Sequence, residues 1–208
     1  MLELTPNEVR VLGSLVEKQI TTPEYYPLTL NALTLACNQK NNRNPVTAFS
    51  EAEVEQALDS LREKNLAYVF HGSTSRVPKY KHVAPEVLHL SPPELAAMCV
   101  IMLSGPQTLG EIRTRGARLY EFSGLEEVEQ TVQALGARDP ETLVTRLPRQ
   151  PGQSEIDVLL AGSLFLPLQI AEDQVPIDHL LQGVLLEPNE RLRIDPRRRR
   201  HRGPCLAA

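Results

Sequence analysis

Short segments of this chain of 208 residues occur twice in the same order, and this repeat restricts the fold more than any other feature. The letters EVEQ stand at residues 53–56 and return at residues 127–130. Upstream, LTPNEV at residues 4–9 and LSPPEL at residues 90–95 both combine a Thr or Ser, a Pro directly after it, and a Glu three residues after it. This combination is typical of a helix N-terminus with a capping box and a Pro in the first turn. The sequence therefore predicts one structural unit written twice.

Each copy is predicted to begin with a helix whose apolar residues recur at helical spacing. These residues are Val9, Leu12 and Val16 in the first copy, and Leu95, Met98, Cys99 and Met102 in the second. The spacing indicates amphipathic helices that face a core. A hydrophobic staple residue, Leu4 or Leu90, precedes each cap.

Second and third helices are predicted in both copies. The second helices are expected around residues 28–39 and from Thr108, which forms a capping box with Glu111. The third helices contain the EVEQ letters, and Ser50 and Glu53 form the capping box of the first of them. Their buried stripes are predicted to be Val54, Ala57, Leu58 and Leu61, and Val128, Val132 and Leu135.

After each third helix the sequence changes to a strand, a turn and a strand. Residues 66–83 predict a hairpin with a turn around Gly72, and Pro78 favours an edge position for its second strand. Residues 142–160 predict a second hairpin. Three helices followed by a hairpin is the order of a winged helix-turn-helix domain.

The predicted fold class is therefore mainly α with small β hairpins, in two tandem winged helix-turn-helix domains. The first domain is expected to span residues 1–87 and the second residues 88–162, each with its own buried interior. Residues 163–208 are predicted to form an irregular C-terminal tail with a disordered basic end, RRRRHR at 197–202.

Composition excludes several classes of protein. Hydrophobic residues make up 41% and charged residues 23%, and the net charge is −4, so there is no global attraction to nucleic acid or anionic lipid. No apolar run is long enough to span a membrane, and the N-terminus does not resemble a signal or transit peptide.

The three cysteines, Cys37, Cys99 and Cys205, form no CxxC pair. They favour a cytoplasmic protein, with Cys37 and Cys99 as small core residues.

No catalytic or metal-binding pattern is present in the sequence. The five histidines show neither HxxxH nor HExxH spacing, and there is no GxSxG, GxxxxGK[ST] or GxGxxG motif. We therefore expect a protein that is not an enzyme and that needs no metal or cofactor.

Three motifs resemble those of the YceH-like family of bacterial proteins, whose function is uncharacterised. They are LNALTLACNQKNNRNPV, SRVPKYKH and GEIRTRGARLYEFS, and the resemblance covers about residues 2–162. The resemblance implies a tandem winged-helix fold and implies no activity.

One hypothesis is that the first copy binds duplex DNA through its loop and wing. The cations that would contact phosphates are Lys40, Arg43, Arg76, Lys79 and Lys81. Tyr80 and His82 alternate with the last two of them. The alternative for this group is a charged edge strand, on which lysines prevent aggregation.

A second hypothesis is a protein-interaction scaffold that binds no nucleic acid. This hypothesis is based on an acidic stripe along the first copy's third helix. The stripe is formed by Glu51, Glu55, Asp59 and Glu63. Such a stripe repels phosphates, and it is either a solvated surface or a docking face for a basic partner. A homodimer is also compatible with the apolar content of residues 163–188.

The second copy carries an arginine cluster on the helix that begins at Thr108: Arg113, Arg115 and Arg118. Arginine suits contacts with carboxylates or phosphates. The cluster therefore either joins the two domains through acids such as Glu51 or Glu55, or contacts an anion.

Overall fold

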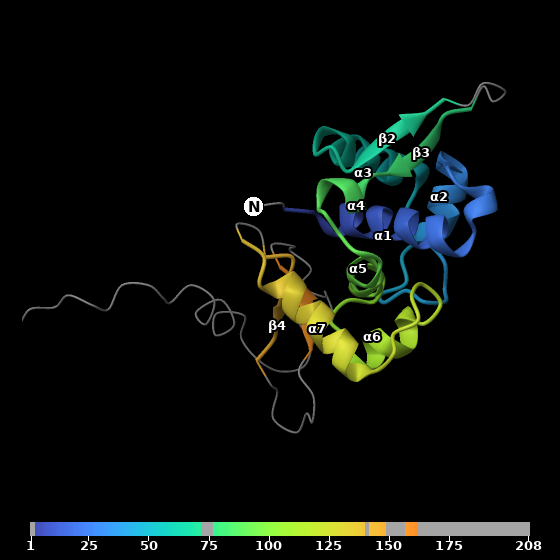
Figure 1. Ribbon diagram of the computed structural model, residues 1–208. Helices are drawn as coiled ribbons and strands as arrows, with labels where there is room; N and C mark the ends of the chain where they lie inside the picture. The colour runs from blue at the N-terminus through green and yellow to red at the C-terminus, as the bar shows by residue number, and fades with distance from the viewer. Residues whose placement is uncertain (1–2, 72–76, 140–141, 149–156, 162–208) are drawn as a thin grey trace, which may run out of the picture. The chain divides into compact units, whose positions relative to one another are not determined.

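The computed structural model describes residues 3–71, 77–139, 142–148 and 157–161 (Figure 1). The predicted tail and its basic end lie outside these residues, as do Arg76 and Cys205. The chain is mainly helical, with small antiparallel sheets. The first repeat consists of α1 Pro6–Thr21, η1 Pro23–Tyr25, β1 Leu28–Thr29, α2 Leu30–Cys37, α3 Glu51–Glu63, β2 Ala67–Phe70 and β3 Lys79–His82.

The second repeat follows a short connecting helix, α4 Ala84–Val87, and has the same order of three α-helices and a hairpin, without counterparts of η1 and β1 among its described elements. Its elements are α5 Pro92–Ser104, α6 Leu109–Gly116, α7 Leu125–Gly136, β4 Val144–Arg146 and β5 Val158–Leu160. In each repeat, three helices therefore precede a hairpin, as the duplicated motifs predicted.

The predicted capping boxes are confirmed at four helix N-termini. In each, the side chain of the cap accepts from the backbone N–H of the Glu three residues later, and that Glu accepts from the cap backbone N–H. The pairs are Thr5–Glu8 in α1, Ser50–Glu53 in α3, Ser91–Glu94 in α5 and Thr108–Glu111 in α6. Because these bonds satisfy otherwise unpaired N–H groups, local sequence fixes where these helices begin.

The first sheet has three strands in the order β1-β3-β2. Leu28 pairs with Tyr80, and Ala67 pairs with His82, so β3 is the central strand. The expectation of an edge position for this strand is therefore wrong. Pro78 lies directly before β3 and removes no ladder hydrogen bond from it.

The second sheet repeats this arrangement with less regular structure. β4 and β5 are antiparallel, with Val144 opposite Leu160. Gln107, which precedes α6, forms an isolated bridge with Val158. In both repeats, the residues before the second helix therefore pair with the hairpin's last strand.

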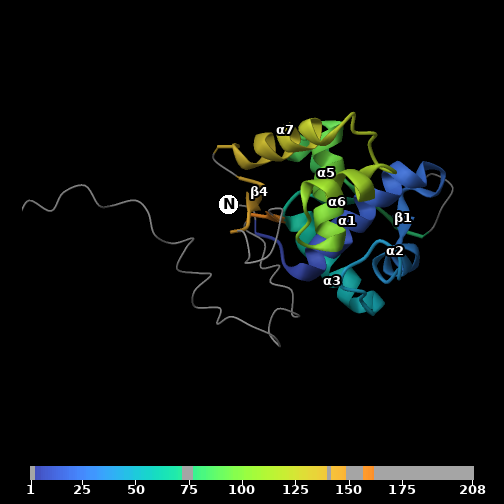
Figure 2. The same ribbon diagram turned by 90° about the horizontal axis from the view of Figure 1, so that it is seen from below.

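The first helices of the two repeats pack against each other at the centre of the structure. Figure 1 shows α1 and α5 between α3 and the first sheet on one side and α6 and α7 on the other, and Figure 2 shows α3 and α7 on opposite sides of this pair. Both helices are buried on every face, over residues 8–17 and 94–104. The predicted apolar stripes of both helices are confirmed as buried, but each helix also has a second buried face, against the other repeat, that was not predicted.

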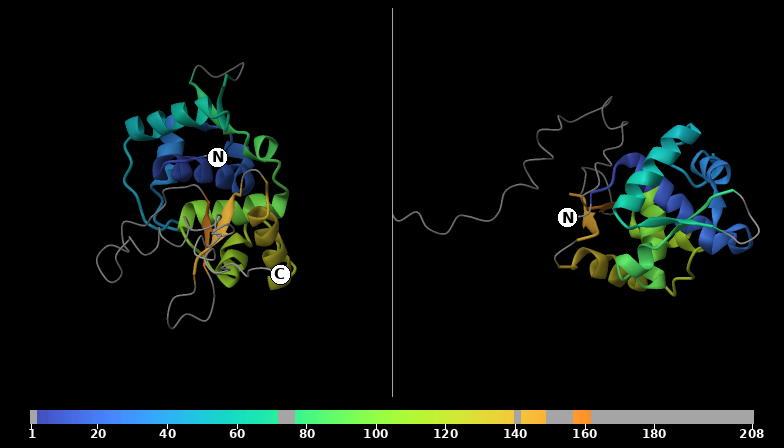
Figure 3. Two further views of the ribbon diagram at one scale, coloured as in Figure 1. Left: turned by 90° about the vertical axis from the view of Figure 1, so that its left-hand side faces the viewer. Right: turned by 90° about the horizontal axis from the view of Figure 1, so that it is seen from above.

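One contiguous hydrophobic core results from this packing. A Cβ on Gly13 of α1 would lie 2.9 Å from the Cβ of Met102 of α5, so only glycine permits this approach. The predicted third-helix stripes are confirmed as buried, and so are Cys37 and Cys99. The expectation that each repeat has a separate interior is wrong, because the buried residues of both repeats belong to one core cluster. The two hairpins lie on different sides of the α1–α5 pair (Figure 3).

Candidate functional site

The outer face of the first sheet carries two aromatic and two cationic side chains in register. Tyr68 stands opposite Lys81, and Phe70 stands opposite Lys79. Because successive strand residues alternate between faces, these four residues share one face. Tyr68 is 38% exposed and Phe70 is 42% exposed, while both lysines are half-buried.

The ammonium group of Lys81 and the ring of Tyr68 lie close together on this face. The Nζ atom of Lys81 lies 6.0 Å from the centroid of the Tyr68 ring, which is within the range of a cation–π contact. Neither Lys79 nor Lys81 forms an ion pair with an acid among the residues that the structure describes. Their charges are therefore not neutralised by a described carboxylate.

Tyr80 and His82 lie on the opposite, inner face, so they do not alternate with the lysines on one surface. The backbone N–H of His82 donates to the hydroxyl of Tyr26 at 2.8 Å, and Nδ1 of His82 accepts from the N–H of Ala84 at 3.3 Å. Burial, with a smaller contribution from the charge of Lys81, lowers the pKa of His82 to about 4. This histidine is therefore a neutral core residue at pH 7.

Arg43 is not available to a phosphate, and its inclusion among the phosphate-binding cations is corrected. Its side chain and that of Glu17 are both fully buried, and they form an ion pair at 2.6 Å. The other Arg43 N–H groups donate to the carbonyls of Ala36 and Asn42. The guanidinium therefore stabilises the loop after α2 from inside.

Glu17 also receives Arg118 from the second repeat, which forms an ion pair with it. The acid that Arg118 meets is thus on α1 and is neither Glu51 nor Glu55. Arg113 and Arg115 are exposed on α6 and form no ion pair within the described part of the chain. The structure therefore separates the arginine cluster into one contact between repeats and two surface cations.

The charge on Glu17 is maintained by this network. Burial by itself raises the pKa of Glu17, but hydrogen bonds and charge from Arg43, with the charges of Arg118 and Lys18, outweigh it and lower the pKa to about 2. Glu17 was not predicted as an important residue. A signal was present, because Arg10, Ser14 and Glu17 recur at helical spacing and mark a polar stripe on α1.

Lys40 is exposed, but it lies apart from Lys79 and Lys81 of β3. Residue Thr29 pairs with Lys79 and directly precedes α2, whereas Lys40 follows the end of that helix. The eight residues of α2 span about 12 Å. Lys40, Arg43, Lys79 and Lys81, the predicted cations that the structure describes, therefore do not form one patch.

The four acids of the α3 stripe are all exposed. Asp59 forms an ion pair with Arg62 at 2.8 Å, and Glu51 accepts from the side chain of Asn31. Burial, followed by the charges of Glu55 and Asp59, raises the pKa of Tyr80, which belongs to the inner sheet face. The stripe therefore lies on the side of the sheet opposite to the lysines.

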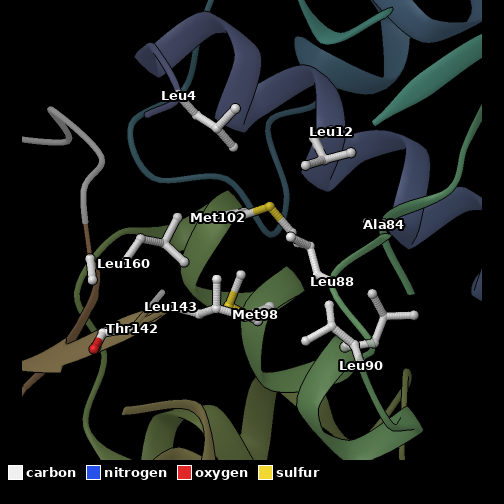
Figure 4. A pocket seen from close by; sticks show the side chains of 12 residues that line it. Leu4, Leu12, Ala84, Leu88, Leu90, Met98, Met102, Thr142, Leu143 and Leu160 are labelled. Carbon is white, nitrogen blue, oxygen red and sulfur yellow. The ribbon is translucent and has the colours of Figure 1, made fainter. Parts of the chain in front are cut away.

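An apolar pocket lies where the two repeats meet (Figure 4). Its lining residues come from α1, α5, the connection between the repeats and the second hairpin: Leu4, Leu12, Ala84, Leu88, Leu90, Leu95, Met98, Met102, Thr142, Leu143, Leu160 and Ala161. The staple residues of both repeats are among them. No titratable side chain lines this pocket, so it offers no acid, base or nucleophile.

Among the described residues, no three His, Cys, Asp or Glu side chains are grouped so that they could hold a metal ion. None of the helices in the described ranges has both the length and the apolar character needed to cross a membrane.

Comparison with known proteins places the repeat in a family. The family model described as "Protein of unknown function, DUF480" matches residues 4–153. A UPF0502 protein of Opitutus terrae is 52% identical over 182 residues, which cover 86% of this chain and 79% of that protein. A UPF0502 protein of Geotalea daltonii is 52% identical over 195 residues, covering 92% and 87%. UPF0502 protein GSU0233 of Geobacter sulfurreducens is 49% identical over 187 residues, covering 89% and 83%. The chain therefore belongs to this bacterial family of uncharacterised function, which confirms the YceH-like resemblance of its three motifs.

Proposed function

We propose that the chain is a non-enzymatic, cytoplasmic protein of two tandem winged helix-turn-helix units that associates with DNA in a regulatory role. The order of elements in each repeat, with a strand residue before the second helix that pairs with the hairpin, supports the winged-helix assignment. Fold alone does not assign a function, so the DNA contact must be argued from a surface.

The outer face of the first sheet is the observation that carries this proposal. Lys79 and Lys81 lie on one face without a described acid partner. Two ammonium groups in this setting suit adjacent phosphates, in a contact that depends on salt and not on sequence. Arg76, which directly precedes this region, stays a predicted contact because it lies outside the described residues.

The third helix of the first repeat is not the contact surface in this proposal. Winged helices often insert their third helix into the major groove. The exposed side of α3 carries Glu51, Glu55, Asp59 and Glu63, and their charges would meet the phosphates on both walls of the groove. The wing face, on the other side of the sheet, avoids this repulsion.

The experiment is a titration of a fluorescent oligonucleotide with the full chain at 50 and 200 mM salt. Two phosphate contacts predict a loss of affinity of about tenfold between these salt concentrations. The double variant Lys79→Glu, Lys81→Glu should weaken the binding strongly and make the remaining affinity less dependent on salt. The matched control, Arg113→Glu with Arg115→Glu, makes the same change in net charge on α6.

The control decides whether the binding is local. If the α6 variant loses as much affinity as the wing variant, binding depends on net charge and the wing site is wrong. If the wild-type chain binds no oligonucleotide at 50 mM salt, the nucleic-acid function is wrong.

A second candidate is a scaffold that binds a basic protein through α3 and does not bind nucleic acid. The exposed acidic stripe favours it, because like charges four residues apart destabilise a helix and so are not explained by helix stability. Glu55→Lys with Asp59→Lys would reverse the central charge of the stripe. A co-purification experiment in which this variant retains the same partners as the wild type would contradict the scaffold.

A further inference from the structure

We propose that the outer face of the first sheet binds single-stranded DNA in preference to duplex DNA, an inference that rests on the proposed function. In this assignment Tyr68 and Phe70 stack on bases, while Lys79 and Lys81 contact the phosphates between them. Aromatic side chains combined with cations are the usual chemistry of surfaces that bind single strands without reading sequence.

The spacing of the two rings favours an unstacked strand. Tyr68 and Phe70 are two residues apart on one strand, so they are separated by about 6.7 Å along it. Stacked bases follow one another every 3.4 Å or so. Bases that dock on both rings must therefore be unstacked, which a single strand allows and an intact duplex resists.

The second repeat shows that a hairpin of this kind does not need exposed rings in order to form. Its outward pair at the equivalent place is Thr145 and Leu159, with neither a ring nor a cation. The same hairpin therefore forms without this chemistry. The aromatic and cationic pairs of the first sheet are a property of this copy alone, within the described strands.

The assignment is to DNA because the face has a single side-chain group that can accept from a 2′-hydroxyl, which is the hydroxyl of Tyr68. Lys79 and Lys81 can donate to a 2′-hydroxyl oxygen, but they can equally donate to the phosphate oxygens that DNA and RNA share. Recognition of the 2′-hydroxyl is what lets proteins select RNA. The matched RNA is included in the experiment for this reason.

The test measures fluorescence anisotropy of four labelled probes with the full chain at 50 mM salt. The probes are a dT 12-mer, a mixed-sequence single-stranded 12-mer, a 12-base-pair duplex and a rU 12-mer. Tyr68→Leu and Phe70→Leu remove the rings but keep apolar volume on the sheet, and circular dichroism checks that each variant folds. Tyr68→Phe keeps the ring and is the matched control.

We expect both single-stranded DNA probes to bind at least tenfold tighter than the duplex. Each Leu variant should weaken single-strand binding by about fivefold or more, and duplex binding by less than twofold. Tyr68→Phe keeps the ring and should therefore retain more single-strand binding than Tyr68→Leu. Because Leu is tolerated in strands, a loss seen only with the single strand is not explained by unfolding.

Four results would overturn the inference. Equal affinity for single strand and duplex would do so. If the Lys79→Glu, Lys81→Glu variant loses binding in that case, the proposed DNA association is retained and only the preference for single strands is wrong. Leu variants that bind like the wild type would show that the rings do not stack on bases. Binding of rU at least tenfold tighter than dT would overturn the assignment to DNA. Binding of no probe would remove both this inference and the proposed function.

Discussion

Replacing Glu17 with Gln should destabilise the protein by an amount that depends on pH in a defined way. Glu17 is fully buried on α1 and forms ion pairs with Arg43 and Arg118. The substitution keeps the shape of the side chain but removes its charge. It leaves the buried guanidinium of Arg43 without its counter-ion, which is the costly way to break such a pair.

The magnitude follows from the pKa of Glu17, which is lowered from 4.5 to about 2 in the folded chain. At about 1.4 kcal/mol per pKa unit, this corresponds to roughly 3 kcal/mol of folding free energy at pH 7. Because the folded pKa is below the unfolded one, the contribution is complete above pH 4.5 and is lost as the pH falls through 2. At pH 3 about 1.5 kcal/mol of it should remain.

The assay is urea denaturation of the wild type and Glu17→Gln at pH 7, 5, 4 and 3. Other carboxyl groups titrate in both proteins, so their contributions cancel in the difference between the two free energies of unfolding. The control is Glu55→Gln on the exposed side of α3, which should change stability by less than about 0.5 kcal/mol. A difference below 1 kcal/mol at pH 7, or one that does not shrink toward pH 3, would refute the reasoning.

The other predictions concern packing, charge and protonation in the same core. Gly13→Ala should lower the free energy of unfolding by about 1–3 kcal/mol because its Cβ would be too close to α5. The control is Gly136→Ala, whose Cβ would have only ordinary contacts and should cause no such loss. Thermal unfolding compares the two variants. Arg43→Gln should cost about 3–5 kcal/mol, and a double-mutant cycle with Glu17→Gln should be clearly non-additive, since the two side chains form one pair. The pKa of His82 is about 4 in the folded chain, below its ordinary 6.5. The free energy of unfolding of the wild type should therefore fall by about 3 kcal/mol on account of His82 as the pH drops from 6.5 to 4. Urea denaturation of His82→Gln over the same pH range should not show this part of the fall.

Local features of the fold could be predicted from the sequence because they depend on neighbours in the chain. A capping box joins residues three apart, so Thr5 and Glu8 already determine where α1 begins. The change from helical to alternating period likewise locates β2 and β3. The duplicated order of elements follows from these short-range signals together.

The arrangement of the repeats could not be predicted, because it depends on contacts between residues far apart in the sequence. Val9 and Leu12 indicate one buried face of α1, but nothing in their spacing shows that α5 covers the other. Gly13 was the available signal, since a glycine inside a helix is unfavourable unless something approaches closely. The shared core follows from that contact.

The candidate site was predicted only in part, because residue type does not distinguish a surface cation from a buried one. Arg43 and Lys79 look alike in sequence as cations near a loop and a strand. A planar guanidinium with five donors can be satisfied by a carboxylate and carbonyls, and Arg43 is. The partners of Lys79 were mistaken as well, because the rings on its face come from the neighbouring strand.

The two copies have diverged in what they contribute. The second repeat supplies α5 to the common core and Arg118 to the buried acid on α1, and its described strands carry no pair of ring and cation on their outward face. The first repeat receives those contacts and keeps Tyr68 and Phe70 exposed beside two lysines. Duplication of the fold therefore does not imply duplication of the site. Since the outer face of the first sheet holds the only such pairs among the described strands, each chain should bind one oligonucleotide and not two. The second repeat then acts by holding α1, and through it the first sheet, in place.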